Sequence, residues 1–362
     1  MLESGVKLSL VKNNNDSRYY DKNESAVFTN SNHFLFDENI NAAYINTRKN
    51  WKKIGVQAGL RFENTHFSGT LKENPAYAGT SFIKKFNNLF FNALINYKLD
   101  SAGNHNVSLR YQRRVNRPNY QQFNPFLVFR DNYSYNQGNI DLNPAYYNDG
   151  QLQYRYKQSI TIGVMYGRAN GILFPTTELV GEKYISKVAN IGYGRLVALN
   201  SNFNFKLAKW WQMNINTQVA SMKLRSRLYS DNINVNSILG RFNWYNQFTF
   251  DKTWSGELSV YYQPNDLQPQ RKIGSRYRVN GSVQKRIIKD KGSVRLSFED
   301  LLHTWVSNDN TINLHRSQEY HLGEADTQRI GLSFSYRFGN EKFTRKRNYN
   351  DNAADTEKAR VE

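Results

Sequence analysis

The sequence contains no cysteine among its 362 residues. That absence excludes disulfide bridges and metal sites built on thiolates. Long hydrophobic runs are also missing, since no stretch approaches the roughly 18 apolar residues of a transmembrane helix. The segment after Met1, LESGVKLSLVKN, has neither a basic start nor a continuous apolar stretch, so it predicts no signal peptide. None of these absences excludes a protein that crosses a membrane with strands, because such strands alternate apolar and polar residues.

Recognisable enzyme motifs are absent as well. The histidines are scattered, with neither H-E-x-x-H nor tight ligand spacing: His33, His66, His105, His303, His315 and His321. There is no phosphate-binding glycine loop and no nucleophile elbow. Glu299 and Asp300 are adjacent, so in a strand they point to opposite faces and form no catalytic pair. We therefore expect no catalytic residues, no metal site and no cofactor, and hence no enzyme.

The charge is strongly one-sided, with a formal net charge of +19 and a pI near 9.8. Such a balance would suit a nucleic-acid-binding protein, which usually concentrates its basic residues in one patch. Here lysine and arginine are spread along the whole chain. A soluble basic β protein that binds nucleic acid stays an alternative, but we expect no nucleic-acid partner.

The feature that dominates the sequence is a strict alternation of apolar and polar residues. In RIGLSFSYRF, residues 329–338, every second residue from Ile330 to Phe338 is apolar or aromatic and the others are small or polar. Period two places the two sets on opposite faces of a strand. The pattern predicts about fourteen strands: 5–12, 38–49, 52–65, 86–99, 105–116, 146–157, 159–170, 190–206, 210–224, 235–250, 253–263, 272–287, 291–302 and 327–338. Most are near or above the ten residues of a membrane-spanning strand, rather than the five or six common in soluble proteins.

The connections between these strands alternate in length. Short ones lie around Asn50, at 100–104, Gln158, 207–209, Asp251 and 288–290, whereas long ones include 13–37, 66–85, 117–145 and 303–326. Outer-membrane barrels have short periplasmic turns and long outer loops. We therefore predict an all-β fold, a transmembrane antiparallel up-and-down β-barrel in the outer membrane. A soluble β-sandwich is the alternative.

The polar faces of the strands would then line the barrel interior. Five arginines fall on them: Arg61, Arg110, Arg155, Arg295 and Arg337. Lipid cannot receive them cheaply, since an arginine at the bilayer midplane of a barrel costs about 2–4 kcal/mol. We interpret them as solvated, partly ion-paired residues of the lumen, with Glu63 as one partner; binding of an anionic ligand is the alternative role.

Two stretches carry a more specific signal. RRVNRPNYQQFNPF (113–126) leads out of one strand and YNQGNIDLNPAY (135–146) leads into the next. Together they resemble a motif of the TonB-dependent outer-membrane receptor barrels, in which R-R-I-N-R-P-x-Y-x-x-L-N-P-F precedes G-N-P-x-L-x-P-E. The matching residues are Arg113, Arg114, Asn116, Arg117, Pro118, Tyr120, Asn124, Pro125, Phe126, Gly138, Asn139, Leu142 and Pro144. Ile140 and Ala145 stand where the family has Pro and Glu.

The last predicted strand resembles the C-terminal assembly signal of outer-membrane barrels. Its positions are filled by Arg329, Gly331, Phe334, Tyr336 and Phe338. The resemblance implies recognition by the barrel-assembly machinery. We expect residues 1–338 to form the barrel and the polar segment 339–362 to be a disordered periplasmic tail.

The receptor family implies more than this chain contains. Its members have a signal peptide, a TonB-contacting segment, a plug domain and 22 strands, so we expect a C-terminal barrel portion whose plug and TonB contact lie in a missing N-terminal part. A complete passive pore is the alternative. The expected activity is uptake of a nutrient such as an iron chelate or an oligosaccharide. Its contacts would lie in the long loops, with Tyr19, Tyr20, Tyr133 and Tyr135 as candidates, and the ligand stays unknown.

Overall fold

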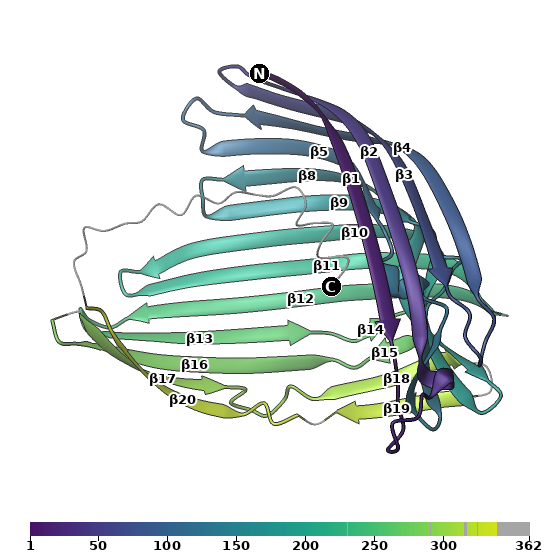
Figure 1. Ribbon diagram of the computed structural model, residues 1–362. Coiled ribbons are helices and arrows are strands. Elements are labelled where there is room, and N and C mark those ends of the chain that lie inside the picture. Colours follow the sequence, from purple (N-terminus) through teal and green to yellow (C-terminus); the bar gives the residue numbers. More distant parts are fainter. Residues whose placement is uncertain (230, 290, 315–316, 324, 339–362) are drawn as a thin grey trace.

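The computed structural model (Figure 1) describes residues 1–338 except 230, 290, 315, 316 and 324. The predicted tail 339–362 lies outside these residues. The main sheet has 16 strands, and most of them follow one antiparallel path. In order, the path contains β1 (Leu2–Ser17), β2 (Asn32–Asn50), β3 (Ile54–Leu71), β4 (Thr80–Lys98), β5 (His105–Asn116), β8 (Ala145–Tyr156), β9 (Ile160–Val180), β10 (Lys183–Ala208), β11 (Trp211–Leu228), β12 (Asp231–Thr249), β13 (Trp254–Gln263), β16 (Arg276–Ile287), β17 (Gly292–Glu299) and β20 (Arg329–Tyr336).

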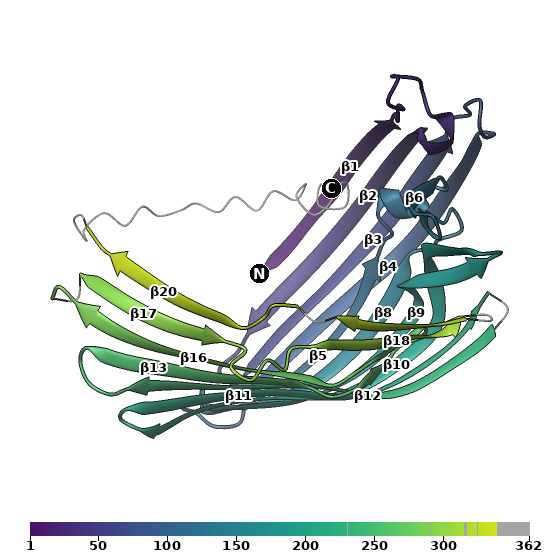
Figure 2. The same ribbon diagram turned by 90° about the horizontal axis from the view of Figure 1, so that it is seen from below.

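The all-β fold predicted from the alternation is confirmed, and each predicted strand coincides with one strand of this path. Among the described residues, β1 and β20 each pair on one side only. Figure 2 shows the sheet bent into an open arc with these two strands at its edges. No described helix is long and apolar enough to cross a membrane.

From β1 to β4 and from β9 to β12 the strands are longer than predicted at the ends that face the long connections, whereas β16, β17 and β20 are two to four residues shorter there. The prediction left 171–189 outside any strand, whereas β9 and β10 continue through it to a turn at Gly181 and Glu182. The expected loops 13–37 and 66–85 likewise shorten to 18–31 and 72–79. Loop 117–145 adds the η2 turn (Tyr120–Phe123), β6 (Leu127–Asp131) and β7 (Ser134–Gln137), and loop 18–31 adds the η1 turn (Phe28–Asn30).

Loops 264–275 and 300–328 form a second sheet of β14 (Asp266–Leu267), β15 (Arg271–Ile273), β18 (Ser307–Leu314) and β19 (Ser317–Gly323). We call the face of the main sheet on which the long connections pack the inner face. Figure 2 shows β18 within the arc on that side. The opposite face is the outer face.

Apolar side chains align across the outer face. The register joins Leu109, Leu152, Val164, Leu199 and Val219 into one row over five neighbouring strands. The first four are 48–53% exposed. At the sheet edge Leu296 pairs with Leu332, which is 75% exposed. A continuous exposed apolar band of this kind matches the lipid-facing surface of a membrane barrel.

The inner face is polar along the strands and apolar only where the long connections cover it. Two hydrophobic clusters lie there, one around Phe34, Phe67 and Phe123, the other around Ile191 and Leu224. The clusters fix the long connections against the sheet, because burying one large apolar side chain stabilises by about 1.5–3 kcal/mol. They therefore hold the loops that surround the candidate site.

Candidate ligand-binding site

A cavity of about 880 Å³ opens on the inner face at the ends of the strands that carry the long connections. Its walls come from the end of β1, the loop 119–138, the β9–β10 hairpin, and residues near β15 and β18. Ligand pockets commonly measure about 300–1,000 Å³. Amide side chains dominate the lining, which includes Asn15, Asn30, Asn32, Asn119, Gln121, Gln122, Asn124, Asn136, Gln137, Gln268 and Gln270.

One wall of the cavity is anchored by a buried ion-pair network at the end of β5. Arg117 leaves the strand and its guanidinium donates to Glu63 on β3, which also accepts from Arg61. The side chain of Glu63 is 8% exposed. Two cations thus offset one buried carboxylate, and Pro118, which follows Arg117, is also buried. The network holds the loop 117–126 against the inner face.

The loop then turns through the short η2 helix into the first hydrophobic cluster. Asn119 and Gln122 form a capping box, each side chain bonding the other residue's backbone N–H. That turn buries Tyr120 and Phe123, and the ring of Phe123 lies 5.2 Å from that of Phe67. The paired donors and the ring contacts give the loop one defined conformation.

Asn124 and Gly138 close this loop on itself. The Gly138 N–H donates to the Asn124 carbonyl at 2.8 Å, and a Cβ at Gly138 would lie 2.3 Å from that oxygen. Any larger residue at 138 would therefore push the two segments apart. The Asn124 amide also donates to the Asn32 side chain at 3.0 Å, which ties the loop to β2.

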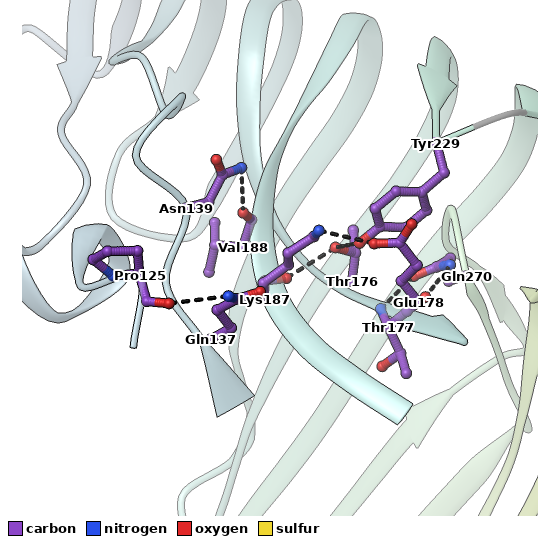
Figure 3. A network of polar contacts seen from close by, with 10 residues as sticks. All are labelled: Pro125, Gln137, Asn139, Thr176, Thr177, Glu178, Lys187, Val188, Tyr229 and Gln270. Carbon is purple, nitrogen blue, oxygen red and sulfur yellow. Dashed lines mark hydrogen bonds and ion pairs between the residues drawn. The ribbon is translucent and has the colours of Figure 1, made fainter. Parts of the chain in front are cut away.

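The β9–β10 hairpin separates the two hydrophobic clusters and forms the middle of the cavity wall. Figure 3 shows the polar contacts of this hairpin. On one side the Asn139 amide donates to the Val188 carbonyl at 3.1 Å. On the other side Gln270 uses both ends of its amide on the Thr177 backbone, at 2.8 and 2.9 Å. Gln270 is 4% exposed. Its buried amide satisfies the backbone N–H and carbonyl of Thr177, as the backbone of a neighbouring strand would.

The cations that line the cavity have acidic partners. Lys187 pairs with Glu178 at 2.8 Å and lies 5.0 Å from the ring of Tyr229 (Figure 3). Arg271 pairs with Asp309. Burial raises the pKa of Tyr229 to about 12, while its hydrogen bond with Thr176 opposes that rise. The cavity therefore presents hydrogen-bonding groups of nearly balanced charge.

The remaining motif residues lie at the edge of this region. Arg114 pairs with Asp149 on the inner face at 2.5 Å, whereas Arg113 lies on the outer face, 5.5 Å from the ring of Tyr146. Other motif positions support the loop: Asn116 ends β5, Pro125 accepts from Gln137, Phe126 and Leu142 are buried in the first cluster, and Pro144 precedes β8. Ala145, where the family motif has Glu, is fully buried.

The predicted lumen arginines have different surroundings. Arg61 and Arg295 have acidic partners on the inner face, the latter Glu257 at 2.5 Å. Arg110 and Arg155 lie on the same face of β5 and β8. Arg337 follows β20 and is exposed, and its backbone N–H donates to the Lys291 carbonyl.

The predicted assembly signal forms the edge strand of the sheet. Arg329 lies opposite Glu299, Phe334 opposite Val294 and Tyr336 opposite Gly292. Gly331 faces Ser297, whose Oγ lies 2.8 Å from the position of an added Cβ. Phe338 lies just beyond the strand and is 86% exposed.

Of the four tyrosines proposed as ligand contacts, Tyr19 lines the cavity and the other three do not. Tyr133 and Tyr135 lie near the β6–β7 turn, where Tyr135 contacts Phe129 and Lys183. The sequence analysis missed the amide residues of the lining. The clusters NNN (13–15) and NYQQFN (119–124) were the available signal. Among the described residues, no three histidine or acidic side chains converge as a metal site.

Comparisons with known proteins agree with this architecture. The model of the outer membrane protein beta-barrel family matches residues 1–336, whereas no curated protein matches the chain. Similar solved structures include the siderophore receptor PiuA from Acinetobacter baumannii (TM-score 0.62, 11% identity), which matches over 92% of this chain and 53% of its own. The ferric yersiniabactin uptake receptor FyuA from Yersinia pestis gives a TM-score of 0.66 at 13% identity over 93% and 51%. The ferric-catecholate import receptor Fiu from E. coli K12 gives 0.63 at 13% over 93% and 52%.

The chain thus spans about half the length of the solved receptors that it resembles. At these identities the likeness extends to the fold alone. The family match covers nearly all of the described strands, and both it and the similar receptors indicate the bacterial outer membrane. The chain belongs to the outer membrane protein beta-barrel family.

Proposed function

We propose that this chain is the barrel portion of a TonB-dependent nutrient importer, whose plug and TonB contact are supplied by a part outside this sequence. The observation that carries the proposal is the open arc: the main path leaves one edge of β1 and one edge of β20 without a partner among the described residues. Barrels have no free edges, because unpaired backbone groups are costly in lipid. Further strands would complete the wall.

The long connections form the ligand-binding end of this importer. They enclose a cavity on the inner face, and their positions are fixed by the ion pairs and hydrophobic clusters described above. A ligand held there would lie between the loops and the lumen. The chain has the role of wall and binding surface rather than of catalyst.

The lining favours a neutral, hydroxylated ligand such as an oligosaccharide over an anionic iron chelate. Amide side chains offer both donors and acceptors, which suits sugar hydroxyls. Tyr19 and Tyr120 add aromatic surface. An anionic chelate would instead be expected to meet cations in excess, but Lys187 and Arg271 are neutralised by Glu178 and Asp309.

Binding measurements on the chain refolded in detergent test this proposal. A panel of neutral oligosaccharides and a ferric tris-catecholate complex serve as probes. We expect at least one oligosaccharide to bind, and the double variant N30A/N136A, which removes two lining amides, to weaken it about tenfold. Asn232→Ala, on the outer face, is the matched control. Binding of the ferric complex alone would overturn the ligand class.

Conductance separates the importer from a passive pore. In a planar bilayer the refolded chain should give no steady open channel by itself, since the described sheet does not close. A stable, anion-preferring conductance would contradict the importer and favour a complete pore.

A further inference from the structure

Three cations lie side by side on the outer face, one each on β9, β10 and β11. The register places Arg168 directly opposite Arg195, and Arg195 directly opposite Lys223. Side chains opposite each other in neighbouring antiparallel strands have Cβ atoms about 4.5–5.5 Å apart. Like charges at that distance destabilise the sheet. The arrangement therefore calls for an anion between them.

The two arginines are held in place by tyrosines of their own strands. The Nε of Arg168 donates to the Tyr166 hydroxyl at 2.6 Å, and its guanidinium lies 5.4 Å from that ring. Arg195 repeats the arrangement with Tyr193, at 2.7 and 5.1 Å. Within the described residues, none of the three cations forms an ion pair with an acid. The guanidinium groups are ordered without being neutralised.

The cations lie at a defined height above the apolar band. On each of the three strands the cation is four residues from a member of the exposed row, namely Val164, Leu199 or Val219. At about 3.3 Å per residue this is roughly 13 Å along the strand. The displacement is toward the long connections, which face the outside in outer-membrane barrels. The cluster therefore lies on the outer-leaflet side of the apolar row, toward the headgroups.

We propose that Arg168, Arg195 and Lys223 form a binding site for the phosphate groups of an outer-leaflet glycolipid of the lipid A type. A phosphate accepts several charge-assisted hydrogen bonds, and guanidinium groups bind it in bidentate geometry. One bound phosphate relieves the repulsion among the three cations. The acyl chains of the same lipid pack on the apolar row below. A free phosphate would make only the first of these contacts.

Native mass spectrometry of the chain in detergent micelles tests the site. The probes are diphosphoryl lipid A, its monophosphoryl form and a zwitterionic phosphatidylcholine. We expect retention in the order diphosphoryl, monophosphoryl, phosphatidylcholine. The triple variant R168Q/R195Q/K223Q should reduce diphosphoryl retention at least tenfold. Lys285→Gln, also on the outer face but beside Trp254 at the other end of the strands, should leave it unchanged.

Two further measurements show whether lipid retention depends on the guanidinium groups rather than on charge alone, and on the acyl chains rather than on phosphate alone. The conservative variant R168K/R195K keeps the charge but not the guanidinium fork, so it should retain an intermediate amount of lipid. Inorganic phosphate at millimolar concentration should not displace the lipid, because it lacks the apolar contacts. Equal retention by the triple variant and the unchanged chain, or displacement by inorganic phosphate, would overturn the proposal.

Discussion

At the scale of single residues, the carboxylate of Glu63 holds the loop 117–126 in place on the inner face. Its carboxylate is buried between Arg117 and Arg61. Glu63→Gln leaves two cations without their acid, and breaking a buried pair in this way costs about 3–5 kcal/mol. We expect the variant to unfold in detergent at a clearly lower temperature, measured by the heat-dependent mobility shift on gels.

Glu257→Gln provides the matched control for that experiment. It removes the acid of an ion pair on the same inner face, but its partner Arg295 has a side chain that is 40% exposed. A pair of this exposure contributes about 0–1 kcal/mol. If both variants unfold alike, the anchoring role of Glu63 is wrong.

Tyr229 gives a pH-dependent prediction at the same scale. Its pKa is raised to about 12, so the folded protein keeps this proton between pH 10 and pH 12 while the unfolded chain releases it. The stability that the raised pKa contributes is complete below pH 10 and is lost as the pH rises to 12. Spectrophotometric titration of the folded chain should show one late tyrosine that is missing in Tyr229→Phe. A titration curve unchanged near pH 12 would contradict the assignment.

At the scale of elements, sequence alternation predicted every strand of the main path but misplaced several ends. Alternation is enforced where one face meets lipid and the other meets water. Beyond the apolar band β9 and β10 contribute side chains to both hydrophobic clusters, so the period-two pattern fades from 171 to 189 while the backbone ladder continues. The ends could not be predicted because hydrogen bonding, rather than hydrophobicity, determines them there.

At Gly171 the side chains of β9 exchange faces of the sheet, so that even-numbered residues point outward before it and inward after it. Before it Ile162 and Val164 point to the outer face, and after it Ile172 and Phe174 pack in the second inner cluster. Its φ is +64°, which costs other residues about 1–2 kcal/mol. Gly171→Ala should therefore destabilise the folded chain by about that amount in chemical unfolding. Gly150→Ala, where an added Cβ meets nothing within 4 Å, is the control, and equal stability of the two variants would disprove the requirement.

At the scale of the whole molecule, the cavity joins residues that are far apart in the chain. Asn15, Gln137 and Thr311 line the same space, yet nearly 300 residues separate the first from the last. Alternation predicts strands and their faces, but it contains no information on which loops meet above them. The motif at 113–126 leads into a loop that forms one wall of the cavity, while the walls from β1 and β18 could be found only from the folded arc.

The direction in which tryptophans point tests the arc as a membrane wall. Trp210, Trp211 and Trp254 lie at the end of the sheet with the short turns, and the rings of the first two contact that of Phe248 on β12. Trp305 instead lies on the inner side, between Arg276 and Arg278.

In bilayers of brominated lipid, a variant that keeps only Trp254 should lose most of its fluorescence, because bromine quenches at contact distance. A variant that keeps only Trp305 should lose little, since the sheet lies between that ring and the lipid. Equal quenching of the two would show that lipid reaches both faces, and the outer face could then no longer be the membrane surface.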